Sequence, residues 1–151
     1  MATLVAKTVD PGGTGHYTTL SACEAANFGA SNANLTVSDE YCVTTCICTN
    51  GAADATLVSI AGQTTDATRN ITIVVDSSYR HNGTYQTGNV YRLVTTADNY
   101  SLQCATSNVT INGVCFGLNV ASGGYDMCIY LTGATTTNVH ITNCVFKHID
   151  A

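Results

Sequence analysis

A short strand motif, T-x-N-[IV]-x-I, occurs three times in this chain and constrains its fold more than any other feature. The copies begin at Thr68, Thr106 and Thr136. The two branched residues of each copy are two positions apart, so both side chains point to the same face of a strand. A strand pattern that returns after roughly 30 to 40 residues is typical of a solenoid, whose stacked repeats share one core.

The motif predicts an all-β chain that folds as a short right-handed parallel β-helix. Its branched positions are predicted to point inward with two later phenylalanines, giving the core Ile71, Ile73, Val109, Ile111, Val139, Ile141, Phe116 and Phe146. The polar residue between the branched pair (Thr72, Thr110 or His140) faces water. A β-sandwich also has short strands at regular spacing, but it does not predict a repeated motif.

The chain is predicted to form one domain with a helix near its beginning. Residues 1–16 are a lead-in segment, and residues 17–30 hold a helix capped by Thr18 or Ser21 that seals the first coil. Residues 31–151 form the β-helix, with about four to five coils. Further strands are expected at 35–37, 56–60, 90–94 and 127–131.

The composition limits the classes of partner. Charged residues make up 10% of the chain, and the net charge is −5. Nucleic-acid binding needs clustered Lys and Arg, so it is not expected. No apolar run approaches the ~20 residues of a membrane-spanning helix, and residues 1–10 do not resemble a signal peptide.

Eight cysteines are many for a chain without an export signal. We predict that most are buried thiols, although disulfides remain an alternative that the sequence does not resolve. Cys42, Cys46 and Cys48 form a C-x3-C-x-C pattern, but no fourth metal ligand or gathering loop accompanies them. No metal and no cofactor is therefore predicted.

The sequence contains no catalytic grouping that we recognise, so no catalytic residue is predicted. A glycosidase needs two carboxylates across a cleft, and Asp39 and Glu40 with Asp76 or Asp98 are the best candidates for such a pair. These residues share no position in the repeat. The four histidines are scattered and are interpreted as surface side chains.

The start of the chain resembles a known family. The segment Y-T-T-L-S-A-C-E-A-A at residues 17–26 resembles the Y-[TS]-[TS]-L-S-A-W-E-A-A start of right-handed parallel β-helix repeat proteins found in bacteriophage and environmental sequences. Residues 62–68 and 79–84 resemble two later signatures, G-W-T-T-D-A-T and E-R-H-N-G-T. Cys23 and Gln63 stand where the family usually has Trp. The resemblance implies the fold and identifies no catalytic residues.

From the resemblance, the low charge and the absence of a catalytic grouping we predict a non-enzymatic structural protein of a virus particle, such as a capsid decoration, head-fibre or spike protein. The last strand is predicted to expose an assembly edge at Val145, Phe146, His148 and Ile149, which favours a homo-oligomer or a subunit docked on a protein partner. One alternative is a carbohydrate-binding or depolymerase fragment, whose outward tyrosines would contact a surface glycan: Tyr79, Tyr85, Tyr91 and Tyr125. A second alternative is a subunit of an extracellular filament.

Overall fold

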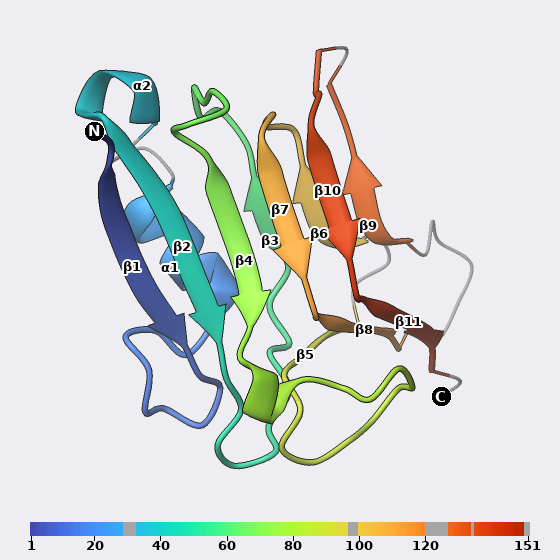
Figure 1. Cartoon of the computed structure of the whole chain (residues 1–151). Helices are drawn as coiled ribbons and strands as arrows, with labels where there is room; N and C mark the ends of the chain where they lie inside the picture. The colour runs from blue at the N-terminus through green and yellow to red at the C-terminus, as the bar shows by residue number, and fades with distance from the viewer. Residues whose placement is uncertain (29–32, 97–99, 120–126, 134, 150–151) are drawn as a thin grey trace.

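The computed structural model describes residues 1–28, 33–96, 100–119, 127–133 and 135–149 (Figure 1). This part of the chain is mostly β, with two short α-helices, α1 (Leu20–Asn27) and α2 (Leu35–Ser38), and one 3-10 turn at Ser77–Tyr79. The strands are β1 (Thr3–Val9), β2 (Glu40–Cys46), β3 (Val58–Ile60), β4 (Ile71–Val75), β5 (Arg92–Thr95), β6 (Tyr100–Cys104), β7 (Val109–Asn112), β8 (Cys115–Leu118), β9 (Met127–Leu131), β10 (Val139–Thr142) and β11 (Val145–His148).

The strands form three parallel sheets. One sheet has the order β1-β2-β4-β7-β10, the second β5-β8-β11 and the third β3-β6-β9. From β3 to β11 the chain visits the three sheets in the same order three times, so β3-β4-β5, β6-β7-β8 and β9-β10-β11 are three repeats, and β9-β10-β11 is the last repeat. Figure 1 shows the strands of the five-stranded sheet side by side in this order. The parallel, mostly β architecture agrees with the prediction from the motif.

The three copies of the motif lie in register on β4, β7 and β10. Ile71 is opposite Val109, and Val109 is opposite Val139. Along β4 and β7 the side chains alternate between buried and half-buried, as the motif predicts. The fully buried members of the predicted core are Ile71, Ile73, Val109, Ile111 and Phe116.

The asparagines before and after these strands shape the turns. Asn108, Asn138 and Asn143 have φ angles of 56°, 55° and 49°, a left-handed conformation that asparagine tolerates better than most residues. The side-chain amide of Asn138 donates a hydrogen bond to Oδ1 of Asn108 over 3.1 Å, and that of Asn143 donates to Oδ1 of Asn112 over 3.1 Å. Equivalent turns of neighbouring repeats are therefore bonded to each other.

Helix α1 begins in the predicted region, but with a different cap. Thr19, rather than Thr18 or Ser21, accepts a hydrogen bond from the backbone N–H of Ala22. The helix buries Leu20 and Cys23 and packs against β1, β2 and β3. The helix spans Leu20–Asn27 with Phe28 as its C-cap, which is shorter than the predicted 17–30, and residues 29 and 30 lie outside the described residues.

Two segments differ from the sequence prediction. The lead-in predicted at 1–16 contains β1, which pairs with β2 along its whole length. The strand predicted at 35–37 is instead helix α2. Asn34 caps that helix by accepting from the N–H of Val37, and Asp39 ends it in a left-handed conformation, so local turn chemistry overrides the branched residues.

Asp10 fixes the loop that follows β1. Its buried carboxylate accepts hydrogen bonds from the backbone N–H of Gly12 and from the hydroxyls of Thr14 and Thr49. Burial opposes ionisation, but these hydrogen bonds hold the pKa of Asp10 well below its usual range. The carboxylate therefore ties the glycine-rich segment to the residues that follow β2.

Candidate functional site

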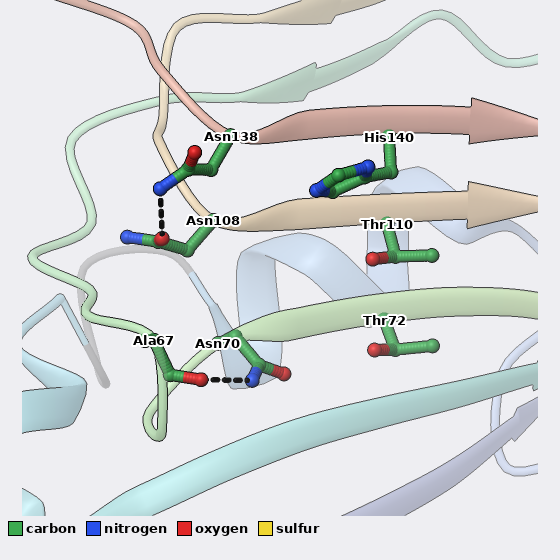
Figure 2. A pocket seen from close by; sticks show the side chains of 7 residues that line it. All are labelled: Ala67, Asn70, Thr72, Asn108, Thr110, Asn138 and His140. Atoms are coloured by element: carbon green, nitrogen blue, oxygen red, sulfur yellow. Dashed lines mark hydrogen bonds between the residues drawn. The ribbon is translucent and has the colours of Figure 1, made fainter.

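A shallow polar groove of about 270 Å³ crosses the outward face of the five-stranded sheet. We call it the Asn/Thr groove and define it by its lining, which is Ala67, Asn70, Thr72, Asn108, Thr110, Asn138 and His140. Figure 2 shows the polar side chains in two columns that run from β4 over β7 to β10. Three copies of one motif, distant in sequence, therefore build one continuous surface.

The register of the strands sets the two columns. The asparagines stand directly before the strands, and Thr72, Thr110 and His140 occupy the middle position of the motif. Thr72 is opposite Thr110, and Thr110 is opposite His140. Because neighbouring parallel strands lie about 4.8 Å apart, a similar polar group recurs along the groove at that interval.

The two columns differ in their hydrogen bonds. The amide nitrogens of the asparagine column are used internally: Asn138 donates to Asn108 over 3.1 Å, and Asn70 donates to the carbonyl of Ala67 over 3.1 Å. In contrast, the side chains of Thr72, Thr110 and His140 make no hydrogen bond to any residue that the structure describes. This second column keeps its donors and acceptors for a ligand or for water.

The groove continues toward β2. A second depression of about 400 Å³ shares Asn70 and Thr72 with the first and adds Tyr41 and Val43 from β2, with Met1, Ala2 and Thr68. Val43 is opposite Thr72, so it extends the threonine column, and Tyr41 extends the asparagine column. Neither lining contains an Asp, Glu, Lys or Arg side chain. The N-terminal ammonium of Met1 lies 3.7 Å from Oδ2 of Asp39, so its charge is paired and the extended surface is polar and nearly neutral.

The sequence predicted part of this groove. The outward position of Thr72, Thr110 and His140 follows from the motif, and the structure leaves them half-buried or exposed. The asparagine column was not predicted as part of a site, although Asn70, Asn108 and Asn138 share one position of the repeated motif. Tyr41 carries no motif around it, so the sequence offers no signal for its place.

A second surface lies at the edge of the three sheets that is farthest from β1, on the last strand of each sheet. β9, β10 and β11 are the last strands of their sheets (Figure 1). Three large apolar side chains there are exposed, Leu131 by 48%, Ile141 by 36% and Phe146 by 51%. The residues paired with them on the adjacent strands β6, β7 and β8 are fully buried, namely Cys104, Ile111 and Phe116.

Three residues of this last repeat that were predicted to lie in the core are not fully buried. Ile141 and Phe146 are exposed and Val139 is half-buried, because no described strand stacks beyond them. Of the predicted edge residues, Val145 and Ile149 are half-buried and His148 is exposed, like Phe146. The rings of Phe116 and Phe146 are nearly parallel, with centroids 5.3 Å apart, so the exposed ring continues the column of the buried one.

The described carboxylates that were considered as a glycosidase pair, Asp39 and Asp76, do not lie close together. Asp39 precedes β2 and binds the guanidinium of Arg69, with 2.9 Å between Oδ1 and the nearest nitrogen. Asp76 comes directly after β4, at the other end of the sheet. By the register of β2 against β4, Asp76 lies roughly 26 Å from Asp39 along the strand direction. A pair of glycosidase carboxylates is separated by less than about 10 Å. Asp98, the other candidate, lies outside the described residues.

The cysteines are free thiols that line the core. Six are buried, while Cys128 and Cys144 are partly exposed. Burial raises the pKa of the Cys42 thiol to about 12, so it stays protonated at neutral pH. Among the described residues no three His, Cys, Asp or Glu side chains are arranged to hold a metal ion, and the C-x3-C-x-C pattern lies inside the core.

One buried carboxyl connects the helix to the sheets. Asp54 is 1% exposed, and its Oδ2 accepts from the N–H of Leu20 at 2.7 Å and from the hydroxyl of Tyr91 at 3.0 Å. Burial raises the pKa of both Asp54 and Tyr91. These groups face each other in the interior, with no access for a substrate, so we assign them a structural role.

The predicted outward tyrosines need a correction. Tyr91 is fully buried because its hydroxyl reaches Asp54, so the prediction that it faces solvent is wrong. Tyr79 and Tyr85 are half-buried, and Tyr125 lies outside the described residues. Neither Tyr79 nor Tyr85 lines the Asn/Thr groove.

Comparison of the chain with protein-family models, curated proteins and solved structures gives no match. The resemblance to bacteriophage and environmental β-helix proteins therefore stays a prediction. In the described part of the chain, no helix has the length and apolarity needed to cross a membrane. Any functional proposal rests on the chain's own two surfaces, the Asn/Thr groove and the exposed end of the last repeat.

Proposed function

We propose that this chain is a non-enzymatic structural protein, folded as a right-handed parallel β-helix, that joins an assembly through its last repeat. The observation that carries the proposal is the exposure of apolar side chains on the last strands, where the matching side chains one strand inward are fully buried. The resemblance to bacteriophage proteins makes a virus particle the proposed setting, with the chain as a capsid decoration, head-fibre or spike protein.

The order of the strands supports the β-helix. A chain that passes through the same three sheets repeatedly, always with parallel pairing, winds around one common core. Crossover connections between parallel strands of one sheet are right-handed in nearly all proteins, which supports the right-handed form. In this fold the exposed strands form the last coil that the structure describes.

The last coil is held in place by an upstream loop. Nε2 of His81 lies 2.7 Å from the backbone carbonyl oxygen of Asn143, a hydrogen bond that requires the Nε2–H tautomer. The ammonium group of Lys147 lies 5.2 Å from the centre of the Tyr85 ring, a cation–π contact. The exposed apolar face is therefore already ordered before a partner binds, which lowers the entropy cost of docking.

We propose a second copy of this chain as the partner at this face. The described residues of the last repeat, 127–133 and 135–149, include Lys147 but no Asp or Glu, so two such faces meet without strong repulsion. A head-to-tail filament is disfavoured, because continuing the register would place Lys7 of β1 on Ile141. Helix α1 also packs against β3 and obstructs stacking there. A closed dimer with twofold symmetry fits these features.

The test is the molar mass in solution of the wild type and of an Ile141→Ser/Phe146→Ser double variant. Light scattering coupled to size-exclusion chromatography is expected to give twice the 15.7 kDa of one chain for the wild type at high concentration, and the single mass for the variant. Both side chains are partly exposed, so the variant is expected to stay folded.

Val37→Ser is the matched control, because Val37 is an apolar side chain that is 81% exposed on α2, away from the last repeat. It is expected to keep the mass of the wild type. A wild-type chain that remains a monomer at every concentration, or a Val37→Ser variant that loses the dimer equally, would contradict the proposal.

A further inference from the structure

The Asn/Thr groove has features that the assembly proposal does not use. It lies on the outward face of the five-stranded sheet, whereas the proposed dimer uses the ends of the sheets. Two depressions, of about 270 and 400 Å³, join through Asn70 and Thr72 into one surface. This surface extends across β2, β4, β7 and β10, or three strand spacings, which is about 14 Å.

The chemistry of the lining identifies the class of ligand. Its polar side chains are hydroxyls, amides and one imidazole, and neither depression has an Asp, Glu, Lys or Arg side chain. Nucleic acids and acidic polysaccharides carry negative charge that a site must balance with cations. A neutral ligand rich in hydroxyl groups matches this surface better, because hydroxyls both donate and accept hydrogen bonds.

The hydrogen bonds within the groove show which groups are available. Thr72, Thr110 and His140 make no side-chain hydrogen bond within the described residues, and they stand in one column. Beside them, the bond from Asn138 to Asn108 holds the neighbouring column in a fixed orientation. The free groups are therefore presented in a row by a pre-ordered frame (Figure 2), which reduces the entropy cost of binding.

Tyr41 adds an apolar surface at the β2 end of the asparagine column, beside the row of free groups. It is half-buried and contributes to the lining next to Asn70. An aromatic ring beside a series of hydroxyl and amide groups suits a sugar, which has an apolar ring face and polar edges. A column of recurring groups suits a ligand that also extends, rather than a single small molecule.

We infer that the Asn/Thr groove and the adjoining depression on β2 together bind a neutral oligosaccharide, which lies across β2, β4, β7 and β10. Tyr41 contacts the apolar face of one sugar, and the hydroxyls of Thr72 and Thr110 with the imidazole of His140 bind hydroxyl groups along the chain. The groove is shallow and open, so binding is weak, with a dissociation constant on the order of 0.1–1 mM. The inference does not depend on the dimer.

The test is titration of the isotope-labelled protein with cellotriose, maltotriose and mannotriose, followed by backbone amide chemical shifts. At least one of these neutral trisaccharides is expected to cause saturable shifts at Thr72, Thr110 and His140. Trigalacturonate, an acidic trisaccharide of similar size, is expected to bind much more weakly, because the groove offers no cationic side chain.

The decisive variant is Thr72→Val/Thr110→Val, which removes two hydroxyls and keeps the β-branched shape of both side chains. Its dissociation constant is expected to rise about tenfold. Thr45→Val is the matched control, since Thr45 lies on the same strand as Tyr41 and Val43 but outside both linings. The amide spectrum of each variant reports whether it is folded. Absence of saturable shifts with all three neutral sugars, or equal affinity in the double variant, would overturn the inference.

Discussion

Phe116→Ala is expected to lower the free energy of unfolding by about 3–5 kcal/mol, the usual cost of removing a buried aromatic ring. Phe116 is fully buried on β8, with Leu93 of β5 on one side and Phe146 of β11 on the other in the same register. Truncation removes contacts with both neighbours and leaves a cavity between two repeats. Chemical denaturation followed by circular dichroism measures the loss.

Phe146→Ala is the matched comparison, because it removes the same type of side chain at the paired position of the adjacent strand, β11. Phe146 is 51% exposed, so part of its surface stays in water in the folded chain. At a concentration where the chain is a monomer, the variant is expected to lose only about 1–2 kcal/mol. Equal losses for the two variants would contradict the inward stacking of these residues.

Asp54→Ala is expected to cost about 2–4 kcal/mol, because it leaves buried donors without an acceptor. The lost bonds are those from the N–H of Leu20, the hydroxyl of Tyr91 and the N–H of Thr56, at 2.7, 3.0 and 3.1 Å. Since Leu20 is the first residue of α1, hydrogen exchange of the α1 amides is expected to accelerate more than that of β7. Denaturation and hydrogen exchange together measure both effects.

Asp54→Asn separates the hydrogen bonds from the charge, because it keeps one acceptor oxygen and is expected to lose less stability. Burial raises the pKa of Asp54 in the folded chain, so the unfolded chain ionises first as the pH rises. The wild type should therefore lose stability relative to Asp54→Asn between the unfolded pKa, about 3.9, and the higher folded value. A stability difference that does not change with pH would contradict this role.

The sequence predicted those parts of the fold that depend on a repeated local pattern. Branched residues two positions apart specify the inward face of β4 and β7, and Ile71, Ile73, Val109 and Ile111 are buried accordingly. The position of β1 could not be predicted, because its pairing with β2 joins residues far apart in sequence. The burial of Tyr91 was missed for the same reason, since its partner Asp54 lies 37 residues away.

The candidate groove was only partly visible in the sequence. The motif shows that Thr72, Thr110 and His140 share one outward position, but it does not show that their polar groups stay unpaired. That depends on the side-chain bonds of the neighbouring asparagines, which only the three-dimensional arrangement reveals. The contribution of Tyr41 depends on the register of β2 against β4, a long-range feature without a local signal.

The motif copies stack as neighbouring parallel strands in register, and a pair of engineered cysteines checks this arrangement. Thr72 and Thr110 are opposite each other on adjacent strands, at about 4.8 Å, within the range that a disulfide spans. Mild oxidation of the folded Thr72→Cys/Thr110→Cys variant is expected to give this cross-link in peptide mapping by mass spectrometry. The Thr72→Cys/His140→Cys variant, whose positions are two strands apart, is expected to give none. A missing first cross-link, or an equally efficient second one, would contradict the stacked repeat.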